Sequence, residues 1–325
     1  MASFIDVSGL TYCGQEAQEI FSKDIYDIDL RQYGVTFMDG VKGKMKIYNG
    51  EIGDVWQEYT CPFTPDGDVV LAEAFIEPAA IKVNMEECYD KFWNTFLVEQ
   101  TSITLNGGIP QTFSEWFFDK LRKKMAKEYQ EIAWMGDTGI TSASTGYQYK
   151  KVTDGWEKQL ASALTGATLS GNVVTLSALT VENVIGQVED VIMKGIEVAA
   201  AQGVDTENYK LFMNHSDVRV LEVALGKVCC PNSVNQIFGN YARENGRIYV
   251  MGYEVVPTMQ SRDKMIFGPA SNLVLGYDTF DSHIEYKLID MRNTTGDNTF
   301  RILAISNIAV GVVLPELFVL GKKSE

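Results

Sequence analysis

The feature that most constrains the fold is one long amphipathic segment, residues 113–135. Thr112 and Glu115 form a capping box at its start, in which each side chain satisfies an amide that the first turn leaves free. Apolar residues then recur at spacings of three and four, which places them on one stripe of a helix. They are Phe118, Leu121, Met125, Tyr129 and Ile132. The sequence therefore predicts a helix about 35 Å long, with Gly136 as a left-handed cap.

The opposite face of this predicted helix is basic. It carries Lys120, Lys123, Lys124 and Lys127. One interpretation is a solvated face supported by pairs one turn apart, such as Asp119–Lys123. The other is a stripe that meets an acidic partner. The chain itself supplies acid, with 43 Asp and Glu against 28 Lys and Arg, and residues 1–100 hold 18 of the acids but only 7 of the bases.

The net charge of −15 without a basic block argues against a direct reader of nucleic acid or a binder of anionic lipid. The first basic residue is Lys23, so we expect no signal peptide, which would begin with a basic segment. The longest apolar run near the end, residues 308–314, is too short to cross a bilayer. The odd number of cysteines, five, without a CxxC motif favours a reducing compartment. The adjacent Cys229 and Cys230 could form a redox pair, although ordinary loop thiols are favoured.

We find no catalytic constellation in the sequence. The two histidines, His215 and His283, are isolated, and a structural role is favoured for His215 at a predicted strand-to-helix turn. HExxH, GxSxG, GxGxxG and Walker-type motifs are absent. Asp66-Gly67-Asp68 resembles the start of a calcium-binding loop but lacks the ligand at the fifth position, so a polar turn is favoured. We therefore predict no catalytic residue, no cofactor and no metal site.

Residues 35–80 have an extended pattern that begins with three alternating lysines, Lys42, Lys44 and Lys46. Asn49-Gly50 is a strong hairpin signal, and Pro65-Asp66-Gly67 predicts a second turn. A long ribbon with few core residues is not stable alone. We expect either a surface flap or a ribbon that packs on a neighbouring subunit.

The rest of the chain predicts a mixture of helices and strands. Helices are expected over 85–97, after the cap Thr180, and over 217–225, with an irregular loop over 226–247. Strands are expected over 209–213, 247–256, 264–267, 273–275, 284–289, 300–305 and 310–320.

Five segments in this order resemble the major capsid proteins of tailed bacteriophages, the Hong Kong 97-like family. They are residues 69–71 with 78–87, the AWMGDTG run at 133–139, residues 211–214 before Ser216-Asp217, residues 252–256 with 265–268 and 274–278, and residues 311–320. Together they cover nearly the whole chain.

The resemblance implies an α+β Hong Kong 97-like capsid fold. Its expected parts are an N-terminal arm (1–33), an extended β-hairpin called the E-loop (34–80), a peripheral domain (81–179) with the spine helix 113–135, an axial domain (180–257), and return strands of the peripheral domain (258–325). Some relatives carry a cleaved N-terminal scaffolding segment. Because this arm starts at Met1, we expect a separate scaffold or none, and no maturation cleavage.

The resemblance also implies a function without catalysis. The chain would self-assemble as hexamers and pentamers into the icosahedral virion shell that encloses double-stranded DNA, after synthesis in the host bacterial cytoplasm. It would bind no membrane and read no DNA sequence, and its candidate partners are separate scaffolding, decoration and portal proteins. The alternatives are an encapsulin-type nanocompartment shell and, less favoured, an acidic α+β hydrolase.

The resemblance further implies that the ribbon of one subunit lies over the spine helix of its neighbour. The lysines of both elements are then the expected contact residues: Lys42, Lys44, Lys46, Lys120, Lys123, Lys124 and Lys127. Some relatives join a ribbon lysine to an asparagine of the neighbour through an isopeptide bond. For Lys42, Lys44 and Lys46, ordinary solvated side chains are favoured.

Overall fold

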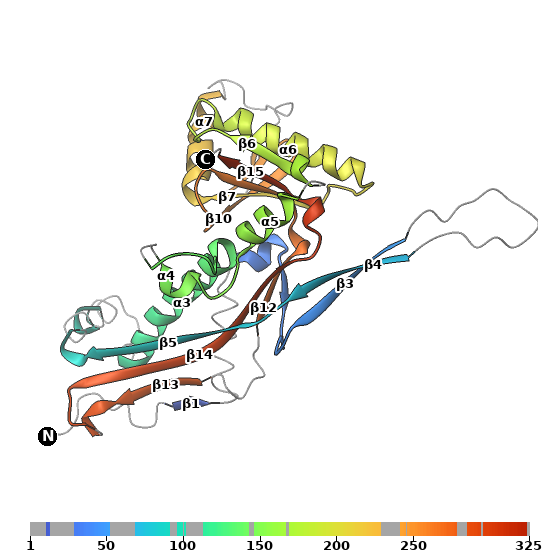
Figure 1. Cartoon of the computed structure of the whole chain (residues 1–325). Helices are drawn as coiled ribbons and strands as arrows, with labels where there is room; N and C mark the ends of the chain where they lie inside the picture. The colour runs from blue at the N-terminus through green and yellow to red at the C-terminus, as the bar shows by residue number, and fades with distance from the viewer. Residues whose placement is uncertain are drawn as a thin grey trace, which may run out of the picture.

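The computed structural model describes residues 11–13, 29–52, 69–91, 96–99, 101, 113–142, 146–166, 169–228, 241–244, 246–277, 285–293 and 295–323. These residues form two main sheets, a long helix and a two-stranded ribbon. Figure 1 shows one sheet with its helices at the top, the other sheet with the long helix below, and the ribbon directed away from the body.

The lower, six-stranded sheet is built around one long strand, β14. Its strands are β14 (Thr299–Val312), β13 (Glu285–Asp290), β5 (Ala79–Cys88), β12 (Leu273–Tyr277), β2 (Thr36–Met38) and β1 (Thr11–Cys13). β14 pairs antiparallel with β13, β5 and β12, while β2 runs parallel to β12 and β1 adds to β13. Alternate residues of β14 are buried because one face of the sheet packs on the core.

Two local predictions for this region need correction. The helix expected over 85–97 is wrong in its start, because β5 continues through Cys88 and pairs with β14 as far as Thr299, and the described residues 89–91 and 96–97 are helical. Asn49-Gly50 is not a turn, since it lies within β3 (Met45–Ile52), opposite β4 (Val69–Ile76). In both places cross-strand pairing over eight or more residues outweighs a local preference. The turn expected at Pro65-Asp66-Gly67 lies outside the described residues.

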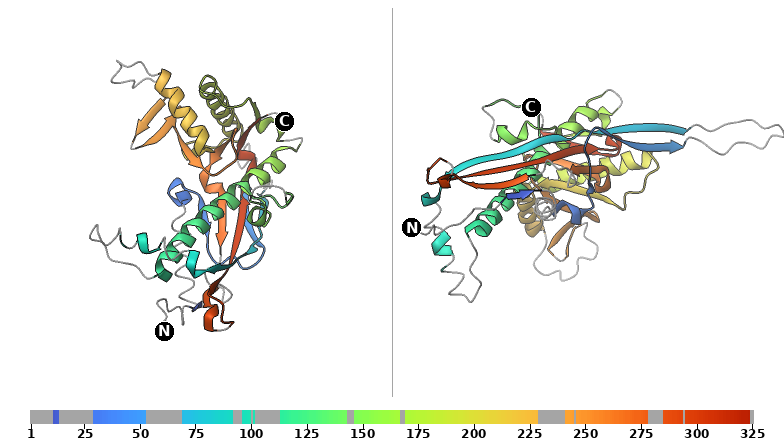
Figure 2. Two further views of the ribbon diagram at one scale, coloured as in Figure 1. Left: turned by 90° about the vertical axis from the view of Figure 1, so that its left-hand side faces the viewer. Right: turned by 90° about the horizontal axis from the view of Figure 1, so that it is seen from below.

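The upper, seven-stranded sheet carries two helices, α6 (Val184–Ala201) and α7 (His215–Val228). Its order is β6 (Val173–Leu176), β15 (Val319–Lys323), β11 (Lys264–Pro269), β7 (Tyr209–Asn214), β10 (Tyr253–Thr258), β9 (Arg247–Val250) and β8 (Tyr241–Glu244). Val188, Val191 and Ile192 of α6 are completely buried in a cluster that includes Leu211 and Phe267. Figure 2 shows both helices packed beside this sheet.

The end of the chain links the two sheets. The single strand expected over 310–320 is wrong, because β14 ends at Val312 and a short helical turn, Pro315–Leu317, separates it from β15. Pro315 has no N–H to donate, so it interrupts the ladder and lets the chain change sheets. β11 and β15 therefore lie in the same sheet as β7 and β10. The first two strands follow the domain boundary expected near residue 258, and the other two precede it.

The long helix is α3 (Phe113–Met135), which confirms the predicted helix over 113–135. Trp134 near its end packs edge-on against Trp156 of α5 (Trp156–Leu164), with ring centroids 4.8 Å apart. The left-handed cap expected at Gly136 is wrong, since Gly136 does not have a positive φ. A glycine is needed there for close approach, because a Cβ would lie 2.3 Å from the carbonyl oxygen of Thr153. None of the described helices is long and apolar enough to span a membrane.

Candidate functional site

The ribbon formed by β3 and β4 projects from the body of the molecule (Figure 1). Among the described strands, these two pair only with each other, from Met45–Ile76 at the root to Ile52–Val69. The root is anchored by Ile76, which is 1% exposed and packs in a small cluster with Val41. Figure 2 shows the ribbon continuing past one end of the body. A two-stranded ribbon is marginal in water, so this projection gains stability when another surface covers it.

The charge of the ribbon changes along its length. At its root, the ammonium groups of Lys44 and Lys46 lie 4.6 and 5.4 Å from the centroid of the Phe75 ring, and that ring is 47% exposed. Lys42 is also exposed. Residues 47–76 contain no Lys or Arg. Their acids are Glu51, Asp54, Glu58, Asp66, Asp68 and Glu73. The sequence of the ribbon is therefore acidic beyond its three lysines.

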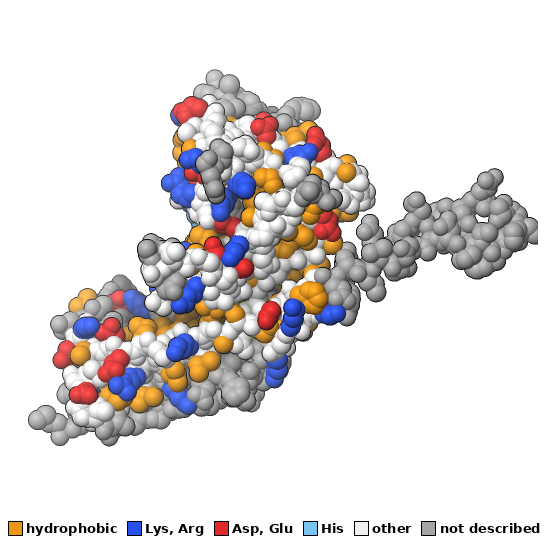
Figure 3. All heavy atoms as spheres, viewed as in Figure 1, with side chains coloured by type: hydrophobic (Ala, Val, Ile, Leu, Met, Phe, Trp, Pro, Cys, Tyr) orange, Lys and Arg blue, Asp and Glu red, His pale blue; other side chains and the backbone are white. Residues whose placement is uncertain are grey.

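The predicted lysine stripe of α3 is exposed. Three of its members form salt bridges within the chain: Lys120 with Glu99 at 2.7 Å, Lys124 with Glu128 at 3.0 Å, and Lys127 with Glu131 at 3.9 Å. The hydrogen bond that Lys124 donates to Glu128 raises the pKa of Lys124 above its ordinary value. Among the described residues, Lys123 has no such partner. Figure 3 shows the basic and acidic side chains intermixed over this end of the body.

The underside of α3 is fastened to the sheet. The Tyr129 hydroxyl donates to the carbonyl oxygen of Asn307 at 2.5 Å, and Ile132 is 2% exposed. Glu131 accepts a hydrogen bond from the Tyr149 hydroxyl and lies 3.5 Å from the ammonium of Lys150. Burial, followed by the bond to Glu131, raises the pKa of Tyr149 well above its usual value. The lysine stripe is thus presented by a helix that is held on its other face.

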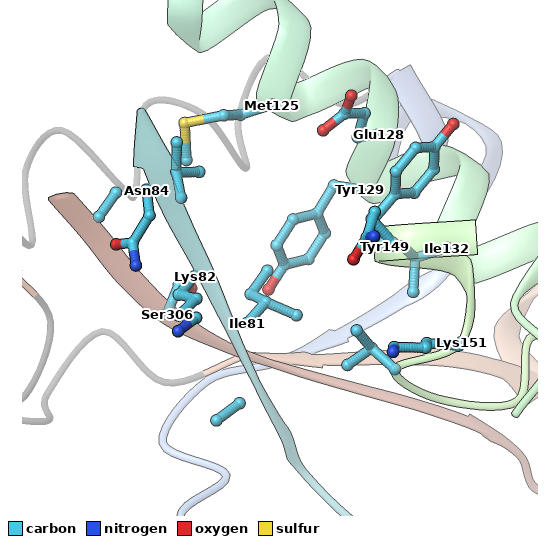
Figure 4. Close-up of a pocket in the computed structure, with 15 residues that line it drawn as sticks. Ile81, Lys82, Asn84, Met125, Glu128, Tyr129, Ile132, Tyr149, Lys151 and Ser306 are labelled. Atoms are coloured by element: carbon cyan, nitrogen blue, oxygen red, sulfur yellow. The ribbon is translucent and has the colours of Figure 1, made fainter. Parts of the chain in front are cut away.

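A groove of about 580 Å³ separates α3 and α4 (Tyr147–Lys150) from β5. Figure 4 shows the Tyr129 ring of α3 directed toward Ile81 of β5 across this space, with Met125 toward the Asn84 end and Ile132 toward Lys151. Lys82, Asn84, Glu128 and Lys151 supply its polar lining, and Ser306 of β14 contributes a buried hydroxyl. Sequence reasoning missed this groove, because the alternation at Ile81 and Val83 indicates a strand but not what lies beside it.

The remaining candidates for chemistry are easily placed. His215 begins α7 directly after β7, at the predicted strand-to-helix turn. Among the described residues, no group of three His, Cys, Asp or Glu side chains comes together as a metal site. His283, Asp66-Gly67-Asp68 and the pair Cys229–Cys230 lie outside the described residues.

Comparison with known proteins identifies the fold. No family model matches the chain, and no curated protein matches it in sequence. Solved structures do match. A chain of the satellite phage P4 procapsid including size determination (Sid) protein has 11% identity and a TM-score of 0.59, with coverage of 95% of this chain and 90% of that one.

Two further structures agree. The capsid of Myoviridae phage XM1 has a TM-score of 0.53 at 10% identity and covers 91% of this chain and 92% of its own. A chain of Microbacterium phage Oxtober96 has a TM-score of 0.51 at 11% identity, with coverage of 100% and 95%. The chain therefore has the Hong Kong 97-like fold of these phage capsid structures.

Proposed function

We propose that this chain is a major capsid protein, which self-assembles into the icosahedral shell enclosing the double-stranded DNA of a tailed phage. The observation that carries the proposal is the match over 95% of the chain to a procapsid protein, together with a ribbon that projects from the body. A capsid protein functions by associating with other copies of itself and catalyses no reaction. Its location is the virion.

The charge distribution supports a contact between ribbon and spine helix in neighbouring subunits. Residues 47–76 of the ribbon hold six acids and no base, whereas α3 exposes four lysines, and one copy can supply both surfaces. This contact is head-to-tail, and head-to-tail contacts close into rings when the rotation between subunits allows it. Exposed ion pairs contribute only about 0–1 kcal/mol each, so they set register and association rate, while apolar contacts supply most of the stability.

Expression of the chain alone, followed by size-exclusion chromatography and electron microscopy, tests the proposal. We expect closed shells, or rings of five and six subunits, and particles from infected cells should contain DNA. Shells that enclose enzyme in place of a genome would favour an encapsulin. A protein that stays monomeric, even when phage lysate is added, would refute a shell function.

Charge reversal tests the helix surface. The double variant Lys123→Glu and Lys127→Glu should impair assembly and leave the folding of the monomer intact, because both side chains are exposed. Lys194→Glu with Lys227→Glu is a matched control, with the same change in charge on α6 and α7. Normal particles from the first variant, or equal impairment in the control, would contradict a role for the α3 stripe.

A further inference from the structure

One edge of the six-stranded sheet is open along β5. This strand pairs with β14 over its ten residues, and no described strand pairs with its other side. Five consecutive residues of β5, Ala80 to Asn84, line the groove. Only alternate residues point to each face of a strand, so this run indicates that the strand edge borders the groove.

The groove also holds an unsatisfied polar group. Ser306 is 4% exposed, and its hydroxyl has no hydrogen-bond partner. It lies opposite Ile81 in the pairing of β14 with β5, and Figure 4 shows it beside β5. An unpaired strand edge with free space beside it is a site where another strand can add.

The sequence of β5 identifies the strand that fits, because it is complementary to itself in antiparallel pairing. When Asn84 lies opposite Asn84 of a second copy, Lys82 faces Glu86 and Val83 faces Met85. Lys82 and Glu86 are exposed, and Met85 is an exposed apolar side chain. Opposite charges that face each other across strands are stabilising, whereas like charges are not.

The register is specific. A shift of two residues in one direction places Lys82 opposite Cys88, and a shift in the other direction places it opposite Asn84. Both lose the charge pair. In the centred register, Arg301 already lies 2.8 Å from Glu86, so Lys82 of the second copy would complete a row of alternating charge. A two-fold axis makes each of these contacts twice.

We propose that two copies of the chain associate through β5, antiparallel about Asn84, and join their six-stranded sheets edge to edge. Residues 86–88 of each copy enter the groove beside Ala80 and Lys82 of the other. The contact is isologous, and so differs from the head-to-tail contact of the ribbon. It rests on the edge of β5 and does not depend on the proposed shell function.

Disulfide trapping tests the pairing, in a chain whose five native cysteines are replaced by serine. Opposed Cα atoms in an antiparallel pair are about 4.5–5.5 Å apart, within the range of a disulfide. Asn84→Cys should therefore form a disulfide-linked dimer on mild oxidation. The control, Lys82→Cys alone, should stay monomeric, because its two copies lie about 14 Å apart along the strands. Mixing Lys82→Cys with Glu86→Cys should restore the link.

A charge swap tests the register independently. In the Asn84→Cys chain, Lys82→Glu should lower the rate of dimer formation roughly tenfold, because two attractive pairs become repulsive. Adding Glu86→Lys together with Arg301→Glu, which keeps residues 86 and 301 oppositely charged, should restore the rate. Failure of this rescue would overturn the proposal. Equal cross-linking of the Asn84→Cys and Lys82→Cys chains would also overturn it. So would an Asn84→Cys chain that does not cross-link although its circular dichroism spectrum and melting temperature match those of the parent chain.

The two proposals fail separately. Normal shells whose Asn84→Cys subunits do not cross-link would overturn the pairing of β5 and leave the shell function standing. Cross-linked dimers that never form rings or shells would do the opposite.

Discussion

The root of the ribbon allows a sharp test of the packing, in which two damaging substitutions should be less damaging together. Ile76 is 1% exposed, and a Cβ built on Gly311 would lie 2.6 Å from its Cγ1 atom. Ile76→Ala removes three buried carbons, worth about 2.4 kcal/mol of transfer free energy, and leaves a cavity, so we expect a loss of about 3–4 kcal/mol. Gly311→Ala alone overpacks the same site and should cost about 1–3 kcal/mol.

The double variant should lose no more than Ile76→Ala alone, because the new methyl group occupies the space that the isoleucine leaves. That methyl would lie 3.8 Å from the Cβ atom of residue 76, an ordinary contact. The double-mutant cycle should then give a coupling at least as large as the cost of Gly311→Ala, about 1–3 kcal/mol. Urea unfolding of the unassembled chain, followed by tryptophan fluorescence, measures it.

Phe75→Ala is the matched control for this cycle, since its ring is 47% exposed and its loss should cost under about 1 kcal/mol. Additivity of Ile76→Ala and Gly311→Ala to within about 0.5 kcal/mol would refute the reasoning, because it would mean that the two residues do not share one space.

Two further predictions concern the packing around α5. The Trp156 indole N–H donates to the carbonyl oxygen of Gly311 at 3.0 Å, so Trp156→Phe should cost about 1–3 kcal/mol in urea unfolding, and an unchanged midpoint would contradict a role for this bond. The Lys158 ammonium, 2.6 Å from Asp137, holds the pKa of that carboxyl below its ordinary 3.8. Because this contribution exists above pH 3.8 and is lost as the pH falls through the lowered pKa, Asp137→Asn should be less stable than the parent at neutral pH but not in strong acid. A stability difference that does not change with pH would exclude this ion pair as its cause.

Much of the fold follows from local pattern. The apolar stripe predicts α3 correctly, because a helix with one buried face must repeat its apolar residues every three to four positions. The run at 209–213 predicts β7 in the same way. The lysines of α3 are exposed where the helical period places them.

Only the tertiary structure decides the rest. Residues 85–88 have a helical pattern but extend β5, and Asn49-Gly50 forms part of β3, because pairing with a distant strand outweighs local preferences of about 1 kcal/mol. The open edge of β5 and the buried hydroxyl of Ser306 likewise depend on which strand lies beside which. Residues close in the chain determine a helix, whereas the sheet position of β5 is set by β14, more than 200 residues away, and no local pattern records that meeting.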